Sequence, residues 1–323
     1  MSDLGTITDL SKTLHVVAGV IYNSQGQILL AQRLPTSHHA GLWEFPGGKR
    51  KMHETSEQAL VRELYEEINI QVEQARPLIR VYHNYPDKYI LLDVWQVEQW
   101  HGRAYGKEEQ LTEWCYLSEF KRKIFPDANY PIITALQLPI CYLITPEPQG
   151  INDKKFFYQL EKCLEKQISL IQLRAYQLNE REYCYCAEKA LNLCERYAAK
   201  LLVNATPEIA LSVGAPGVHL NSQRLSMLSE RPLAKNLYVS ASCHTLHEIL
   251  QANAIEIDFA VVSAVRPTQS HPTAKPLGWQ QFFQFSEQAN FPVFALGGMQ
   301  MSDIPWVWAH GGQGIAAITH LWQ

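Results

Sequence analysis

The stretch that decides the fold of the first half of the chain is EFPGGKRKMHETSEQALVRELYEEINI, residues 44–70. Its second half has the apolar spacing of an amphipathic helix. Glu63, Glu66 and Glu67 stand at i, i+3 and i+4, so their carboxylates share one helical face. Like charges at that spacing destabilise a helix by about 0.2–0.5 kcal/mol per pair unless a cation lies between them. The pattern therefore indicates either a solvated acidic face or a site for a hard divalent cation.

The flanks of the acidic face carry two further signals. Val61, Leu64 and Ile68 lie on the opposite side of the predicted helix, and we expect them to contact a hydrophobic core. Gly47 and Gly48 precede the helix, where the lack of a side chain allows the backbone to approach a ligand closely. The helix is thus predicted to be packed on one side and functional on the other.

The spacing from Gly48 to Ile70 is G-x5-E-x7-R-E-L-x-E-E-x-N-I. It resembles the Nudix box, G-x5-E-x7-R-E-U-x-E-E-x-G-U, in which U is a bulky apolar residue. Asn69 stands where the family has glycine. Asparagine tolerates a left-handed backbone better than most residues, so this departure is expected to be mild.

Nudix enzymes hydrolyse a nucleoside diphosphate linked to another group. The resemblance implies that Mg²⁺, with Mn²⁺ as an alternative, neutralises the phosphate oxygens and helps to activate the attacking water. It also implies that Arg62 orients a carboxylate by ion pairing and that Lys49 lies near the phosphates. The metal ligands that it implies on and beside the helix are Gly47, Glu63, Glu66 and Glu67.

The resemblance extends to the MutT-type 8-oxo-dGTP diphosphatases and spans Leu14 to Leu136. The matching text includes AQRLPTSHHAGLWEFPGGK and FPDANYPII. It implies that Glu113 is a further metal ligand or base and that Asn129 reads the edge of an oxidised guanine, since an amide both donates and accepts hydrogen bonds. The remaining residues that it implies near the nucleotide are Arg33 and Phe45.

Length and composition suggest two domains in one ordinary globular chain. At roughly 100–200 residues per domain, 323 residues favour two, and the text changes character near Leu138–Pro139. We therefore expect a Nudix domain at 1–138, an α+β fold with a mixed sheet in an α/β/α sandwich, and a second domain at 139–323. Within the first domain, LHVVAGVIYN and QILLAQR flank the turn NSQG and predict a hairpin, and KYILLDVWQVEQW predicts a strand.

Charge and cysteine usage exclude several classes of partner. A net charge of −4 gives no electrostatic basis for broad binding of nucleic acid or anionic membranes. Seven cysteines without a CxxC pair favour a reducing compartment. No apolar run reaches the roughly 18 residues of a membrane span. The expected location is the cytoplasm.

Short apolar runs alternate with helical stretches in the second domain. Such alternation predicts a parallel sheet, and eight runs predict a (β/α)8 barrel. The runs are CYLIT, LIQLR, LLVNA, GVHL, YVSAS, FAVVSAV, VFALGG and GIAAIT. Function in such a barrel lies at the carboxyl ends of the strands. The residues expected there as a phosphate or ligand pocket are Arg174, Asn204, Ser242, Thr268, Gly297, Gly298 and Thr319.

The order of these runs resembles the thiamine-phosphate synthase and TenI superfamily, from Ile140 to the C-terminus. Synthases read QxREK where this chain has QLRAY, so Tyr176 replaces a lysine. Ala205 and Arg224 stand at the two aspartates that bind Mg²⁺ with pyrophosphate. His271 replaces a second lysine, and Ala264 replaces the histidine of TenI thiazole tautomerases. The departures imply a barrel that binds a small phosphorylated ligand without synthase chemistry.

The main hypothesis is Mg²⁺-dependent hydrolysis of 8-oxo-dGTP to 8-oxo-dGMP and pyrophosphate, which protects DNA replication from oxidised precursors. One alternative is a thiamine-related or other coenzyme pyrophosphate as substrate. Others are a bifunctional protein with residual thiamine-phosphate synthase activity, and a barrel that is a binding or regulatory module. The expected partners are a nucleotide and, in the barrel, a thiazole or pyrimidine phosphate.

Overall fold

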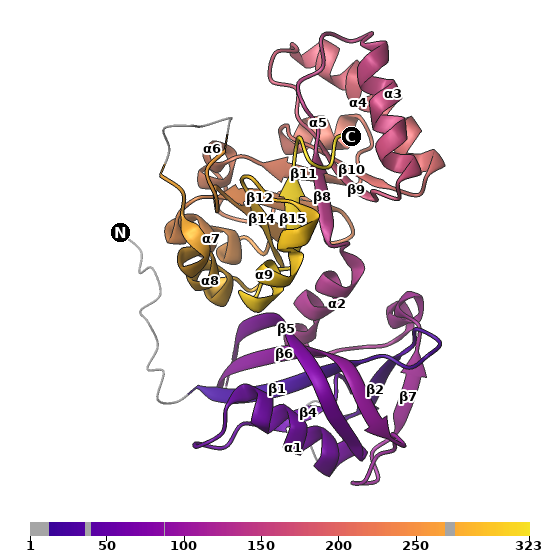
Figure 1. The fold of residues 1–323 in the computed structure, drawn as a ribbon, viewed down its shortest axis with the longest axis vertical. Helices are drawn as coiled ribbons and strands as arrows, with labels where there is room; N and C mark the ends of the chain where they lie inside the picture. The colour runs from indigo at the N-terminus through magenta and orange to yellow at the C-terminus, as the bar shows by residue number, and fades with distance from the viewer. Residues whose placement is uncertain (1–12, 36–39, 87, 269–274) are drawn as a thin grey trace. The chain divides into compact units, whose positions relative to one another are not determined.

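The computed structural model describes residues 13–35, 40–86, 88–268 and 275–323. The chain divides into two compact units, with the division between Gln137 and Leu138. The first unit combines helices with mixed sheet, and the second is a closed parallel barrel (Figure 1). The predicted fold classes, α+β followed by (β/α)8, are confirmed.

Two sheets build the first unit. One has the order β4 (Gly47–Lys49), β1 (Leu14–Ile21), β6 (Lys88–Gly102), β5 (Ile70–Tyr85). The other has the order β3 (Trp43–Glu44), β2 (Ile28–Gln32), β7 (Thr112–Cys115). In the first sheet β1 runs parallel to β6 and antiparallel to β4, and β5 runs antiparallel to β6. This sheet is therefore mixed, whereas the second is antiparallel.

The predicted hairpin between the first two strands is wrong. The strands β1 and β2 belong to different sheets and share one isolated bridge, Tyr22 with Ile28. The turn itself is present, because Asn23 donates its N–H to the Gln27 carbonyl over 3.0 Å. The residues of the turn reverse the direction of the chain locally. The position of each strand is set by long-range pairing instead, of β1 with β6 and of β2 with β7.

Two helices cover opposite faces of β1. Val17 and Ile21 share one core with helix α1 (Ser56–Ile68), whereas Ala18 and Val20 share another with helix α2 (Tyr130–Gln137). Alternate residues of a strand point to opposite faces, so the strand lies between two helical layers. The short 3₁₀ helices η2 (Leu117–Arg122) and η3 (Asp127–Asn129) precede α2.

Helix α1 buries a slightly different face from the one predicted. Leu60, Leu64 and Ile68 are fully buried, whereas Val61 is 38% exposed. Leu60, Leu64 and Ile68 have the i, i+4, i+8 spacing of one helical stripe, and Val61 lies beyond its edge. The capping box of Thr55 and Gln58 begins the helix.

Asn69 ends helix α1 with φ 60° and ψ 33°, and its N–H donates to the Leu64 carbonyl. This is the left-handed conformation that glycine adopts without cost and asparagine tolerates. The glycine of the Nudix box is thus replaced by a residue compatible with the same backbone.

We predict that Asn69→Gly changes the free energy of unfolding by less than about 0.5 kcal/mol. Asn69→Val should lower it by about 1–2 kcal/mol, because a β-branched residue is strained at this backbone conformation. Urea unfolding of the full chain, followed by tryptophan fluorescence, measures both. Equal effects of the two substitutions would contradict the helix-end role.

Eight parallel strands close the second unit, and all eight predicted runs are confirmed as strands. They are β8 (Cys141–Ile144), β9 (Leu170–Leu173), β10 (Lys200–Val203), β11 (Gly217–Leu220), β12 (Tyr238–Cys243), β13 (Phe259–Val262), β14 (Val293–Leu296) and β15 (Gly314–Ala317). Tyr142, Phe259 and Phe294 are fully buried and contact one another inside the barrel. The interior is a packed core, as expected for this fold.

Helices surround the strands as an outer layer (Figure 1). They are α3 (Lys154–Glu165), α4 (Glu180–Arg196), α5 (Pro207–Ser212), α6 (Ser222–Ser226), α7 (Leu246–Ala254), α8 (Gly278–Gln288) and α9 (Ile304–Ala309), with the 3₁₀ helix η4 (Met301–Asp303). Helix α6 has 5 residues and α5 and α9 have 6 each, which is how a short chain completes eight units.

Candidate active site and ligand site

Arg62 binds three of the acidic side chains of the Nudix-like stretch. Its Nε and Nη2 donate to the two Glu54 carboxylate oxygens over 2.6 and 2.8 Å. Its Nη1 donates to Glu63 over 2.6 Å and to Glu66 over 2.9 Å. Hydrogen bonds from Arg62 lower the pKa of Glu54 to about 2. The arginine therefore supplies the positive charge that lets these carboxylates lie together.

Glu67 is held apart from Arg62. Its Oε2 accepts the Gly47 N–H over 2.7 Å, and its Oε1 accepts Gln110 Nε2 over 3.2 Å. Burial raises the pKa of Glu67 to about 7, and the nearby carboxylates of Glu44 and Glu108 act in the same direction. The negative charges of Glu44 and Glu108 thus disfavour ionisation of Glu67, although Glu44 is itself paired with Arg33.

Each of the two glycines before the helix lies where a side chain would clash, and the clashing group differs between them. A Cβ on Gly47 would lie 2.1 Å from the Val17 carbonyl oxygen. A Cβ on Gly48 would lie 2.2 Å from a Glu63 carboxylate oxygen. Gly47 is required by the sheet, where β4 crosses close to β1, whereas Gly48 makes room for an acidic side chain of the site.

The donor chemistry of this region fits a divalent cation, although the side chains are engaged with protein donors. No three His, Cys, Asp or Glu side chains in the described ranges form a ready-made set of metal ligands. Glu63 and Glu66 bind Arg62, and Glu67 binds Gly47. Carboxylate oxygens on one helix face are nevertheless the hard ligands that such cations prefer.

Glu113 makes no contact with these acids in the described structure, and its role as a further metal ligand or base stays a prediction. Glu113 pairs with Leu30 of β2, whereas Glu44 pairs with the adjacent Ala31. Adjacent residues of a strand point to opposite faces, so Glu113 and Glu44 lie on opposite faces of their sheet. The Glu113 carboxylate accepts Lys123 Nζ over 2.8 Å instead.

Sequence reasoning missed Glu44 and Glu108, the acids that do act on Glu67. Glu44 ends β3, three residues before Gly47, and it forms an ion pair with Arg33. Glu108 lies in GKEEQ, next to Gln110, whose amide contacts Glu67. A like-charge pair after a glycine is a weak signal, and only the fold brings this loop to helix α1.

The residues predicted to contact a nucleotide differ in their surroundings. Phe45 is 4% exposed and packs with Phe120 and Phe125 at centroid distances of 6.2 and 6.3 Å. A core role is thus observed for Phe45, while its contact with a nucleotide stays a prediction. The Lys49 side chain is exposed, and its carbonyl accepts Arg62 Nη2 over 3.1 Å.

Asn129 is a buried polar residue, 6% exposed, at the end of η3. Its N–H donates to the Pro126 carbonyl over 2.9 Å. No described residue hydrogen-bonds its carboxamide side chain. This carboxamide can therefore both donate and accept hydrogen bonds toward a ligand.

We predict that Gly47→Ala lowers the free energy of unfolding by about 1–3 kcal/mol, because the added methyl meets the backbone of β1. Gly48→Ala should be nearly neutral for stability, since the flexible Glu63 side chain can move. It should weaken Mn²⁺ binding measured by electron paramagnetic resonance. Unchanged Mn²⁺ affinity in a folded Gly48→Ala variant would contradict the assignment of Glu63.

At the barrel's carboxyl end, Asn204 joins residues that follow three neighbouring strands. Its Nδ2 donates to Gln172 Oε1 over 2.9 Å and to the Tyr176 hydroxyl over 3.1 Å. Its Oδ1 accepts Arg224 Nη1 over 2.9 Å. The Arg174 guanidinium lies 4.7 Å from the centre of the Tyr176 ring. Of the predicted pocket residues, Arg174 and Asn204 are thus brought together.

His219 occupies the barrel interior beside this network. Its Nδ1 lies 2.9 Å from Ser240 Oγ and its Nε2 lies 2.8 Å from Ser242 Oγ. Burial lowers the pKa of His219 to about 3, and the charge of Arg224 acts in the same direction. A neutral imidazole therefore holds the Ser242 hydroxyl, which limits its freedom to bind a ligand.

The other predicted pocket residues follow later strands. Gly297 is buried with φ 107°, where a Cβ would lie 2.8 Å from that of Ala264. Gly298 has φ 62°, and both it and Thr319 are exposed. Thr268 is half-buried, and His271 lies outside the described residues. Within the described ranges, no hydrogen bond joins Gly297, Gly298 or Thr319 to the Asn204 network.

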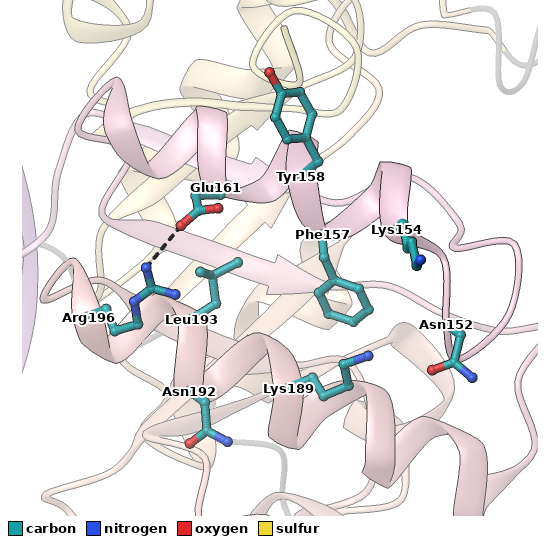
Figure 2. Close-up of a pocket in the computed structure, with 9 residues that line it drawn as sticks. All are labelled: Asn152, Lys154, Phe157, Tyr158, Glu161, Lys189, Asn192, Leu193 and Arg196. Atoms are coloured by element: carbon teal, nitrogen blue, oxygen red, sulfur yellow. Dashed lines mark hydrogen bonds and ion pairs between the residues drawn. The ribbon is translucent and has the colours of Figure 1, made fainter.

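A surface groove lies away from the strand ends, between helices α3 and α4. Figure 2 shows it lined by Asn152, Lys154, Phe157, Tyr158, Glu161, Lys189, Asn192, Leu193 and Arg196. Arg196 donates to Glu161 over 3.1 Å, and Lys189 Nζ lies 4.6 Å from the Phe157 ring centre. Arg196 and Glu161 are thus paired with each other, and Lys189 lies over an aromatic ring.

Family comparisons agree with both halves of the structure. A family model described as NUDIX domain matches residues 17–135, and one described as Thiamine monophosphate synthase matches residues 141–321. The chain therefore belongs to the Nudix family through its first unit and to the thiamine monophosphate synthase (TMP-TENI) family through its second. No helix in the described part of the chain is long and apolar enough to cross a membrane.

Individual relatives match one unit each. An 8-oxo-dGTP diphosphatase of Escherichia coli is 40% identical over 39% of this chain and 98% of its own length. One of Proteus vulgaris is 49% identical over 30% of this chain and 87% of its own. A protein of Aquifex aeolicus, named provisionally as thiamine-phosphate synthase 2, is 35% identical over 57% of this chain and 98% of its own. The first unit is thus homologous to 8-oxo-dGTP diphosphatases.

Proposed function

We propose that the first unit is a Mg²⁺-dependent pyrophosphohydrolase that converts 8-oxo-dGTP to 8-oxo-dGMP and pyrophosphate. The observation that carries this proposal is the acidic face of α1, with Arg62 bound to Glu54, Glu63 and Glu66 and with Glu67 fixed separately by Gly47. Homology to 8-oxo-dGTP diphosphatases supports the substrate. The seven free thiols support a reducing location such as the cytoplasm.

In this reaction, water attacks one of the two phosphorus atoms beside the α–β bridging oxygen, the bond between that phosphorus and the bridging oxygen breaks, and 8-oxo-dGMP and pyrophosphate are released. Glu63, Glu66 and Glu67 would hold the Mg²⁺ ion. When bound, the ion would neutralise negative charge on the phosphate oxygens and lower the pKa of a coordinated water. Arg62 keeps two of these carboxylates oriented toward one another. Gln110 and the Gly47 N–H orient the third. The protein's own contribution is the fixed placement of oxygen ligands.

The base-recognition role is proposed for Asn129. Its buried carboxamide can donate and accept toward the edge of an oxidised guanine. Arg33 pairs with Glu44, and the charges of Arg33 and Glu44 both act on the Tyr85 hydroxyl, which also meets the backbone of Ala128. The pairing of Arg33 with Glu44 supports the proposal that Arg33 lies near the nucleotide.

Glu67→Gln should reduce turnover of 8-oxo-dGTP by at least about 1,000-fold, because the amide cannot replace a negative metal ligand. Pyrophosphate release in the presence of Mg²⁺ measures it, and an unchanged melting temperature shows that the fold persists.

Glu108→Gln and Glu113→Gln provide a matched pair for this test, because each removes one carboxylate charge near the end of the unit. Glu108 belongs to the loop whose Gln110 amide binds Glu67, whereas Glu113 binds Lys123, so we propose that Glu108→Gln lowers turnover more than Glu113→Gln does. Full activity of Glu67→Gln, or a larger loss in Glu113→Gln than in Glu108→Gln, would contradict the assignment.

Asn129→Ala should lower the preference for 8-oxo-dGTP over dGTP by about 10- to 100-fold, since losing one buried polar partner costs roughly 1–3 kcal/mol. Comparing kcat/KM for the two nucleotides measures this ratio. Preserved selectivity would remove Asn129 from base recognition.

A second candidate substrate is a thiamine-related or other coenzyme pyrophosphate, favoured by the fused barrel of the thiamine monophosphate synthase family. For such a substrate Asn129→Ala should matter little. We propose that the barrel itself binds a small phosphorylated ligand, such as a thiazole or pyrimidine phosphate, without synthase chemistry. Tyr176, Ala205 and Arg224 support this, because they remove a lysine and two acids from the synthase pattern.

A further inference from the structure

Arg224 lies at the carboxyl end of the barrel with an incomplete set of partners. It follows β11 on the short helix α6, and its Nη1 donates to Asn204 Oδ1 over 2.9 Å. A guanidinium has five N–H donors, and a neutral amide oxygen satisfies one of them without neutralising the charge. The side chain is half-buried, so solvent compensates for only part of this charge.

Two acids that follow barrel strands, Glu147 after β8 and Glu248 after β12, are bound to other donors. Glu147 accepts Arg174 Nη1 over 3.4 Å and the Gln177 N–H over 2.7 Å. Glu248 accepts the His244 and Thr245 N–H groups over 2.6 and 2.8 Å. No carboxylate in the described part of the chain forms a salt bridge with Arg224. The mouth of the barrel formed by β9, β10 and β11 therefore retains one positive charge.

A divalent cation does not fit this place. The synthase pattern has acids at the positions of Ala205 and Arg224, whereas here one side chain is a methyl group, buried to 4% exposure, and the other is a cation. The remaining oxygen, Asn204 Oδ1, is occupied by Arg224. The positive charge at this position therefore comes from the Arg224 side chain and not from a metal ion.

We propose that this mouth binds a phosphate or diphosphate group directly through Arg224, without a divalent cation. Asn204 fixes the guanidinium from inside the barrel, and the Tyr176 hydroxyl, bound to the same amide, lies beside it as a further donor. Planar guanidinium donors match phosphate oxygens in pairs. This inference rests on the ligand-binding role proposed for the barrel and specifies how the anion is held.

The test is isothermal titration of the full chain with inorganic phosphate, pyrophosphate and an organic monophosphate, each in EDTA and in Mg²⁺. EDTA stops metal-dependent hydrolysis, so the result does not depend on the function of the first unit. We expect at least one of the three anions to bind in EDTA, and which one binds distinguishes an inorganic ligand from an organic one. Arg224→Gln should weaken that binding by at least about tenfold.

Arg196→Gln is the matched control, because it removes the same charge from the α3–α4 groove and should leave affinity unchanged (Figure 2). Arg224→Lys keeps the charge and should bind more tightly than Arg224→Gln, which separates charge from folding. Binding that requires Mg²⁺ would overturn the metal-free site but leave a ligand-binding barrel. No binding under any condition would overturn both, and equal affinity of wild type and Arg224→Gln would place the anion elsewhere.

Discussion

The first unit depends on one guanidinium shared among three carboxylates. Arg62 contacts Glu54, Glu63 and Glu66, and it also holds the Lys49 carbonyl at the start of the loop. Without this charge, the acids that the site requires would repel one another along the helix. Because Glu67 lies outside this network and accepts the Gly47 N–H, the site keeps one carboxylate that is not bound to Arg62.

Both units place an arginine at their candidate sites, but the surrounding charges have opposite signs. Arg62 is outnumbered by carboxylates, so that region favours a further cation. Arg224 is held by the neutral Asn204, so that region favours an anion. A phosphorylated compound would therefore need a metal ion in the first unit and none in the second. If both proposals hold, the chain combines a metal-dependent and a metal-free way of binding phosphate oxygens.

Features that depend on the spacing of residues within one segment could be predicted from the sequence. Features that depend on contacts between distant segments could not. Regular alternation located all eight barrel strands, and the Nudix spacing located the helix, because both patterns repeat locally. The β1–β2 hairpin failed because β6 and β7 were the better partners for those strands. The sequence did not indicate Glu108, because strand register and loop path, which decide the direction of a side chain, are long-range properties.

The most direct test of the account is pyrophosphate release by the full chain, with Mg²⁺, from 8-oxo-dGTP, dGTP, the other deoxynucleoside triphosphates and thiamine pyrophosphate. The account predicts a kcat/KM for 8-oxo-dGTP well above that for dGTP, and little turnover of thiamine pyrophosphate. Equal rates for the oxidised and ordinary nucleotides, or a preference for thiamine pyrophosphate, would contradict it. The substrate would then have to be inferred from the barrel.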